Sequence, residues 1–184
     1  SPVLRRHLTY LLATVYMLGL SAAMKRDPGR LGLDTDRAMI LKMVEDGWDL
    51  SPHTYCFKCM ARRPYRSKHS YNDGRCIARF DHFCLWFDQA VGAGNQVHFL
   101  FFLGHVIFMQ ILGSLTAEMH MTDLDIGSPR WLCFGYLILL NSSMGLFVMY
   151  LFLTTVYNAG CNITVNEQRN WHRRPYSEYC RRSK

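Results

Sequence analysis

Three long apolar segments alternate with polar ones along this chain. Residues 8–24, 99–117 and 132–157 contain no Asp, Glu, Lys or Arg. About 20 apolar residues in a helix are needed to cross the hydrocarbon core of a bilayer. The pattern therefore predicts three transmembrane helices. For 8–24, the shortest of them, a buried core helix remains the alternative.

The segments between these spans complete the expected organisation. Asp27-Pro28-Gly29 predicts a helix stop after the first span. Apolar residues at helical spacing predict a short amphipathic helix within 31–49. We expect the following parts: a first span (1–25), a cytosolic linker with the amphipathic helix (26–55), a cysteine-rich domain (56–98), a second span (99–117), a lumenal loop (118–131), a third span (132–157) and a basic cytosolic tail (158–184).

The charge distribution indicates an orientation. The net charge is +7, and of the 21 Lys and Arg residues 12 lie in 25–79 and six follow Gln168. Cytosolic loops carry an excess of Lys and Arg, so the cysteine-rich segment and the tail are predicted to face the cytosol. The positive charge also suggests contact with anionic lipids. Nucleic acid is the rival partner, but the chain shows no helix-turn-helix or finger array, and the spans argue against it.

A set of metal-ligating residues lies in the cysteine-rich segment. Cys56 and Cys59 are separated by two residues, and His69 and Cys76 follow. Three thiolates and one imidazole suit a tetrahedral structural zinc ion. The residues therefore predict one zinc site, with a chance cluster of free thiols as the alternative. A cytosolic location would keep these thiols reduced.

A second cluster, Asp81-His82-x-Cys84, precedes the second span. An imidazole can accept the proton of a thiol, and a carboxylate can orient that imidazole. His82 and Cys84 share a face only if the backbone is not helical, so we expect an extended or looped segment. The cluster makes Cys84 a candidate nucleophile near a membrane surface.

Motifs across the chain resemble those of the DHHC protein S-acyltransferases, or palmitoyltransferases. The residues that carry the resemblance are Cys56, Cys59, Arg63-Pro64, Arg66, His69, Cys76, Asp81-His82, Cys84, Trp86, Gly92, Asn95 and Phe99, together with Asp27-Pro28-Gly29 and Thr164-Val165-Asn166-Glu167. The phrases around Cys76 and in the tail look most like the ankyrin-repeat branch. The resemblance implies a mainly α, polytopic fold with a small zinc-binding cytosolic domain. It also implies that the first of four family helices, and ankyrin repeats, precede Ser1.

The resemblance implies roles for individual residues. Cys84 would take a fatty acyl group from acyl-CoA as a thioester and pass it to a substrate cysteine, with His82 as base and Asp81 orienting it. Arg63, Arg66 and Lys68 would be the candidates to meet the CoA phosphates. The expected partners are membrane lipids, palmitoyl-CoA and proteins with membrane-proximal cysteines. The expected location is an endomembrane, Golgi or ER.

This chain departs from the family pattern at one set of positions. The family has a second zinc site, and its ligand positions here read Ser70, Asp73, Phe83 and Ala90. All four are altered together, which favours replacement of that site by ordinary side-chain packing. Phe83 also stands in place of the second histidine of the signature, and Leu85 in place of a proline.

Two other functions remain open at this point. The altered positions also suit a zinc-braced membrane adaptor, a pseudoenzyme that holds partner proteins without catalysis. A small channel or transporter is a third class, but it would require charged or interrupted helices that line a transport path. The three spans offer few such features.

Overall fold

The computed structural model describes residues 2–32, 37–47 and 55–172. By its internal contacts the chain forms two units. A helix unit contains residues 1–21 and 98–160, and a cysteine-rich unit contains residues 22–97 and those from Cys161 onward. Each unit is described by itself below.

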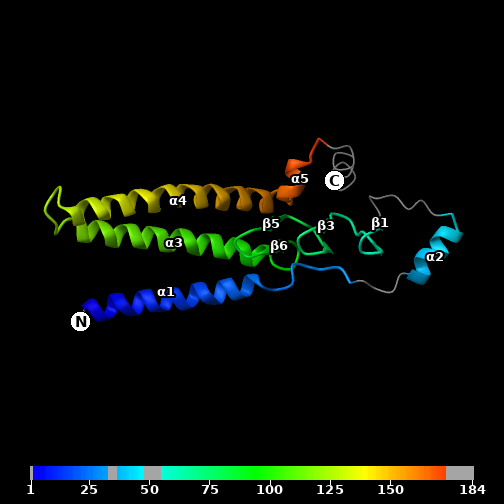
Figure 1. Cartoon of the computed structure of the whole chain (residues 1–184), viewed down its shortest axis with the longest axis horizontal. Helices are drawn as coiled ribbons and strands as arrows, with labels where there is room; N and C mark the ends of the chain where they lie inside the picture. The colour runs from blue at the N-terminus through cyan, green and yellow to red at the C-terminus, as the bar shows by residue number, and fades with distance from the viewer. Residues whose placement is uncertain (1, 33–36, 48–54, 173–184) are drawn as a thin grey trace. The chain divides into compact units, whose positions relative to one another are not determined.

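Three long helices confirm the predicted spans. They are α1 (Pro2–Met24), α3 (Gln96–Met121) and α4 (Pro129–Gly160), drawn in Figure 1. Each is long and apolar enough to cross a membrane. Large apolar side chains such as Leu18, Phe101 and Leu146 lie exposed on them, as expected of surfaces that face lipid rather than water. The chain is therefore an integral membrane protein.

The helices extend beyond the apolar segments that predicted them. The helix α3 begins three residues before Phe99 and continues past Ala117, and α4 also begins before and ends after its apolar segment. Hydrogen bonding along a helix does not stop where hydrophobicity does, so polar residues join both ends. At the start of α4 the Ser128 hydroxyl accepts from Trp131 N–H at 3.2 Å, a cap followed by proline at the first helical position.

Polar side chains connect the three helices to one another. Asn141 in α4 donates to Gln110 O in α3 at 3.0 Å and to Ser114 Oγ at 2.7 Å. Tyr10 in α1 donates to Thr116 Oγ1 in α3 at 2.7 Å. Such bonds suit an apolar surrounding that offers no water as an alternative partner. A cavity of about 410 Å³ remains among the helices, and it is lined by Thr14, Met17, Val106, Met109, Gln110 and Asn141.

The predicted short amphipathic helix is confirmed. The helix α2 spans Arg37–Glu45, inside the segment 31–49 that the sequence pattern indicated. Leu31 lies outside the helix because its N–H donates to Cys76 O at 2.8 Å. A neighbouring strand thus holds this residue in an extended path, which a local pattern of apolar residues does not reveal. Residues 33–36 and 48–54 lie outside the described residues.

The cysteine-rich unit is built from three small antiparallel hairpins (Figure 1). The hairpins are β1 (Tyr55–Cys56) with β2 (Ala61–Arg62), β3 (Lys68–Ser70) with β4 (Arg75–Ile77), and β5 (His82–Cys84) with β6 (Gln89–Val91). Strands of two or three residues bury little apolar surface. Other interactions must therefore hold these hairpins in place.

The turn after α1 fastens the second and third hairpins together. Gly29 O accepts from Ala78 N–H at 2.8 Å, and Pro28 O accepts from Gly94 N–H at 3.2 Å. The approach is so close that a Cβ on Gly92 would lie 2.6 Å from Pro28 O. Glycine is thus required at position 92, where two backbone segments touch.

A short helix closes the unit. The helix α5 spans Val165–Arg169 and begins with a capping box, in which Thr164 and Glu167 bond each other's backbone N–H groups. Thr164 is fully buried and Glu167 nearly so. A buried carboxylate needs further partners, and these lie at the candidate site.

Candidate active site and metal centre

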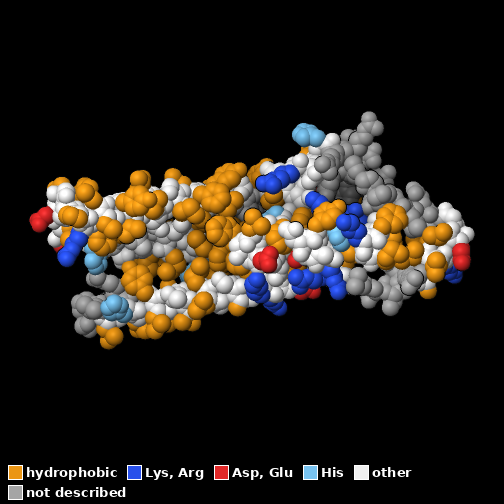
Figure 2. All heavy atoms as spheres, in the orientation of Figure 1, with side chains coloured by type: hydrophobic (Ala, Val, Ile, Leu, Met, Phe, Trp, Pro, Cys, Tyr) orange, Lys and Arg blue, Asp and Glu red, His pale blue; other side chains and the backbone are white. Residues whose placement is uncertain are grey.

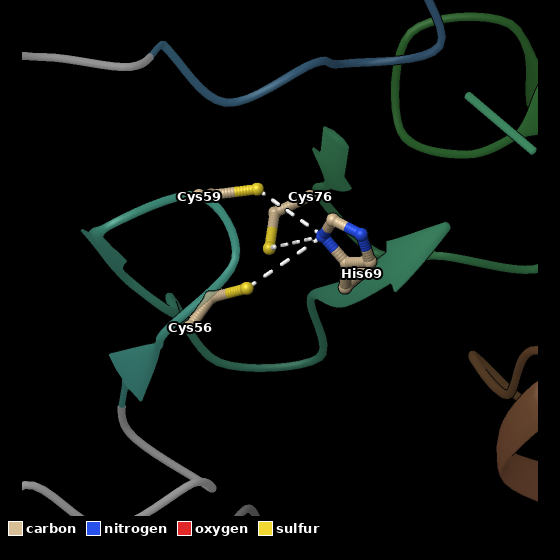
Figure 3. A group of neighbouring side chains, drawn as sticks. All are labelled: Cys56, Cys59, His69 and Cys76. Atoms are coloured by element: carbon tan, nitrogen blue, oxygen red, sulfur yellow. Dashed lines mark hydrogen bonds between the residues drawn. The ribbon is translucent and has the colours of Figure 1, made fainter. Parts of the chain in front are cut away.

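The first two hairpins bring four candidate metal ligands together. Cys56 ends β1 and Cys59 lies in the turn that follows, while His69 and Cys76 are direct cross-strand partners on β3 and β4. Figure 3 shows the three sulfur atoms on one side of the His69 ring, with dashed lines that converge on one ring nitrogen. Their Sγ atoms lie 3.6, 3.2 and 3.9 Å from His69 Nδ1 for Cys56, Cys59 and Cys76. The predicted ligand set is thus assembled.

The geometry fits a tetrahedral ion. All four donor atoms lie within 4.8 Å of one another. Zn–S bonds of about 2.3 Å place the sulfurs of a tetrahedral site roughly 3.8 Å apart. Modest contraction about one ion would therefore bring all four donors into bonding range. The cluster can bind zinc.

The electrostatics of the four groups also suit a cation. Burial and the neighbouring Cys56 and Cys59 thiols raise the pKa of Cys76. Burial, assisted by the charges of Lys58 and Arg63, lowers the pKa of His69. The imidazole is then neutral at pH 7 with a free lone pair, as a ligand must be. Adjacent thiolates repel one another unless a cation lies between them.

The positions of the altered second site hold no comparable ligand set. Among the described residues, the group of Cys56, Cys59, His69 and Cys76 is the one cluster of potential metal ligands. Instead, the Ser70 hydroxyl donates to the Asp73 carboxylate, and Asp73 Oδ1 accepts from Ala90 N–H at 3.4 Å. Phe83 faces Ala90 across the β5–β6 pair.

Apolar packing fills the rest of that region. Phe83 packs against a buried cluster of Ile77, Phe80 and Ala90, of which Ile77 and Ala90 are fully buried. Phe83 and Ala90, two of the four altered positions, thus belong to an apolar cluster. The expectation that ordinary packing replaces the second site agrees with this arrangement.

The third hairpin assembles the candidate catalytic residues. His82 and Cys84 both lie on β5, so the segment is extended, as predicted, and their side chains share one face. His82 Nδ1–H donates to Asp81 Oδ2 at 2.7 Å, and the Cys84 thiol on the same strand contributes to the raised pKa of His82. The carboxylate, imidazole and thiol thus lie in one series.

The pKa values of His82 and Cys84 shift in opposite directions. Burial alone would lower the pKa of His82, but the bonds to Asp81 and Cys84 outweigh it and raise the pKa to about 9. Burial likewise opposes ionisation of Cys84, yet bonds from His82 and from the Trp86 and Phe87 N–H groups lower its pKa. Both shifts therefore favour transfer of the Cys84 proton to His82, which gives a thiolate beside an imidazolium. Such a thiolate is a nucleophile.

The tail holds Asp81 in place, a role that sequence reasoning missed. Val165 N–H donates to Asp81 Oδ1 at 2.7 Å, and Asn166 N–H donates to Asp81 O at 3.1 Å. Asp81 is thereby buried with both carboxylate oxygens occupied. The Thr-x-x-Glu spacing of a capping box was a visible signal for a helix start. No local motif in the sequence indicated which residue this helix start would contact.

The three residues predicted to contact the CoA phosphates bond other residues of this chain. Arg66 forms an ion pair with Glu167, and its NH2 group lies 2.7 Å from Glu167 Oε2. Lys68 Nζ donates to Asn166 Oδ1 at 2.8 Å, and Arg63 donates to Ser67 O at 3.0 Å. Arg66 and Lys68 thus fasten α5 to the hairpins, and a role toward CoA stays a prediction for all three.

Comparison with known proteins identifies relatives. Residues 50–172 match the family model described as DHHC palmitoyltransferase. The human palmitoyltransferase ZDHHC17 is 31% identical over 189 residues, covering 91% of this chain, and the Danio rerio protein of that name is 33% identical over 196 residues, covering 94%. The palmitoyltransferase akr1 of Aspergillus oryzae is 36% identical over 97 residues, covering 48%.

The match covers only part of each relative. The aligned region is 29% of the human protein, 30% of the Danio rerio protein and 13% of the Aspergillus oryzae protein. This chain therefore spans less than a third of the length of these relatives.

Proposed function

This chain belongs to the DHHC palmitoyltransferase family, and we propose that it is a protein S-acyltransferase that moves a palmitoyl group from acyl-CoA to cysteines of protein substrates. The observation that carries the proposal is the series Asp81–His82–Cys84, in which His82 bonds Asp81 and shares one face of β5 with Cys84. It is intact although Phe83 interrupts the family signature.

Cys84 acts as the nucleophile in this scheme. Its thiolate attacks the carbonyl carbon of the acyl-CoA thioester and forms a new thioester, and the CoA sulfur leaves with a proton from His82. A substrate cysteine then attacks the Cys84 thioester, with its proton passing to His82 and Cys84 released as thiolate. Bonds and protons balance over the two steps, and His82 ends in its starting state.

Asp81 and α5 prepare His82 for this exchange. With Nδ1 bonded to Asp81, Nε2 is the ring nitrogen left to exchange a proton with the reacting sulfur. Val165 N–H fixes the other carboxylate oxygen of Asp81, so the imidazole keeps one orientation. Cys56, Cys59, His69 and Cys76 would hold a structural zinc ion, which would link the first two hairpins.

A membrane location suits the substrate. Burying each CH₂ group is worth about 0.8 kcal/mol, so transferring a long acyl chain through water would be strongly unfavourable. The helix unit offers apolar surroundings, including its cavity. By the positive-inside rule we place the cysteine-rich unit in the cytosol, where acyl-CoA is found, and we assign the protein to an endomembrane of the Golgi or ER type.

The proposal is tested by trapping the acyl intermediate. The purified protein, reconstituted in vesicles, is incubated with radiolabelled palmitoyl-CoA, and we expect hydroxylamine-labile label on the wild type. The Cys84→Ala variant should carry none, while Cys133→Ala, at an exposed thiol of α4, should label normally. An unlabelled but folded and zinc-loaded wild type would instead favour a non-catalytic adaptor.

A further inference from the structure

Two adjacent apolar side chains lie exposed beside the reactive thiol. Leu85 and Trp86, which directly follow Cys84 in the turn between β5 and β6, are 82% and 80% exposed. The next residue, Phe87, is buried. Single exposed apolar side chains are common on proteins, whereas a neighbouring pair this exposed at a hairpin tip indicates a contact with something apolar.

The hairpin tip is fastened to the end of the first span. Lys25 Nζ donates to Phe87 O at 2.6 Å. Gln89 Nε2 donates to Met24 O at 3.2 Å and also to Arg26 O. Met24 is the last residue of the apolar segment of α1 that could cross a membrane. The turn that carries Leu85 and Trp86 is therefore held where a span leaves the bilayer.

The other side of the hairpin leads directly into the second span. β6 ends at Val91, and α3 begins at Gln96. Five residues reach at most roughly 18 Å even when fully extended, and here the path is compact because buried Asn95 bonds Gly92 N–H and Ala90 O, at 2.9 and 3.0 Å. The hairpin is thus tied to the ends of two spans.

We propose that Leu85 and Trp86 insert into the headgroup layer of the bilayer and anchor the hairpin there, which sets the depth of Cys84. Tryptophan prefers this layer, because its ring is apolar and its N–H finds polar partners. Basic residues Lys25, Arg26 and Arg30 follow the span end and suit the anionic phosphates of the same layer.

The backbone and the side chains of this turn have different roles. Phe87 N–H donates to Cys84 O at 3.2 Å, and the Trp86 and Phe87 N–H groups lower the pKa of the Cys84 thiol, while the side chains of Leu85 and Trp86 are exposed. A side-chain substitution can therefore remove the membrane contact and keep the backbone of the turn beside the thiol. The depth of the tip can also be measured without any acyl transfer, so this proposal can fail or succeed independently of the proposed function.

The experiment measures the depth of Trp86 by fluorescence quenching. The full chain carrying Trp48→Phe, Trp131→Phe and Trp171→Phe has Trp86 as its only tryptophan. It is reconstituted in phosphatidylcholine–phosphatidylserine vesicles. Lipid brominated near the headgroup should quench the Trp86 emission several-fold more than aqueous iodide does.

A matched control places tryptophan on the neighbouring hairpin. Tyr71 is 73% exposed in the turn between β3 and β4. Tyr71→Trp in a chain with Trp86→Phe and no other tryptophan should be quenched by iodide and spared by the brominated lipid. Iodide quenching of Trp86 equal to that of this control would overturn the proposal. So would an iodide-accessible Trp86 that becomes protected only when a substrate protein is added, since that result assigns the tip to protein docking.

A functional measurement sharpens the outcome. Leu85→Glu should move the Trp86 emission toward iodide accessibility and lower acylation of a membrane-anchored peptide several-fold. Alkylation of Cys84 by soluble iodoacetamide should change less than two-fold. Tyr71→Glu is the control and should alter neither. Unchanged lipid quenching in Leu85→Glu would contradict an anchoring role for this residue.

Discussion

Two neighbouring regions of the cysteine-rich unit are held together by different physical means. Around β1–β4 the sequence supplies Cys56, Cys59, His69 and Cys76, whose donor atoms converge on one point. Around the contact of β3–β4 with β5–β6 it supplies Ser70, Asp73, Phe83 and Ala90, which meet through hydrogen bonds and apolar packing. The first region can be held by an ion, and the second is held by side chains.

The difference shows what a small hairpin needs. Strands of two or three residues contribute few backbone bonds, so a further brace must fix each pair. A bound metal ion contributes a large stabilising free energy through only four residues. Apolar packing contributes a smaller free energy, which is distributed over many contacts. Figure 2 shows orange apolar atoms exposed on the cysteine-rich unit beside blue Lys and Arg atoms. The hydrophobic core of the unit is thus small.

The largest expected effect is the loss of the metal brace. Cys76→Ser removes a ligand at a position that is 1% exposed, and zinc sites of this kind contribute on the order of 10 kcal/mol to small folds. We expect zinc to fall from one per chain to near none and the cysteine-rich unit to unfold, as measured by metal analysis and proteolysis. A zinc-free wild type that resists proteolysis equally well would contradict the comparison.

The second prediction concerns the charged pair on β5. Asp81→Asn removes the carboxylate that raises the pKa of His82 to about 9, so the imidazolium is lost at lower pH and the Cys84 pKa rises. We expect the pH profile of Cys84 alkylation to move to higher pH and acylation to fall about 100-fold or more. The zinc content should stay at one per chain.

The raised pKa of His82 also sets a stability window. A histidine whose folded pKa exceeds its unfolded value stabilises the fold fully below about pH 6.5. This contribution is lost as the pH rises through about 9. In Asp81→Asn the decline should begin at lower pH, which thermal unfolding across this range would detect. Identical pH profiles for variant and wild type would contradict the assigned pair.

The third prediction removes the packing brace. Phe83→Ala leaves a void beside Ile77, Phe80 and Ala90. Because Phe83 is only partly buried, we expect a loss of about 2 kcal/mol in unfolding free energy, less than for a core phenylalanine. Zinc content should be unchanged, and Phe83→Leu should recover most of the loss. A drop in bound zinc would show that the two regions are not independent.

The smallest effect is expected at the hydrogen-bonded side of the same region. Ser70→Ala removes the donor to the Asp73 carboxylate, although Arg30 remains 3.5 Å from it. The net loss should be about 1 kcal/mol, read from chemical unfolding of the reconstituted protein. Tyr71→Phe, at an exposed neighbouring position, is the control and should be near neutral. A loss larger than that of Phe83→Ala would reverse the order of the two contributions.

The sequence by itself determined the elements that depend on local chemistry. Charge-free apolar runs specified α1, α3 and α4, since a bilayer leaves few alternatives for them. The spacing of Cys56, Cys59, His69 and Cys76 specified a shared centre, and the two-residue separation of His82 and Cys84 required an extended strand. These features depend only on residues close together in the sequence, or on the strong preference of the Cys and His donors for one ion.

Only the tertiary structure decided how distant segments meet. The bonds from Val165 to Asp81 and from Glu167 to Arg66 span 84 and 101 residues. The tie between Lys25 and Phe87 likewise spans 62. No local pattern encodes such pairs, because their geometry depends on the path of all the chain between them. The contact with Glu167 also places Arg66 in an ion pair, and the bond from Leu31 N–H to Cys76 O places Leu31 outside α2.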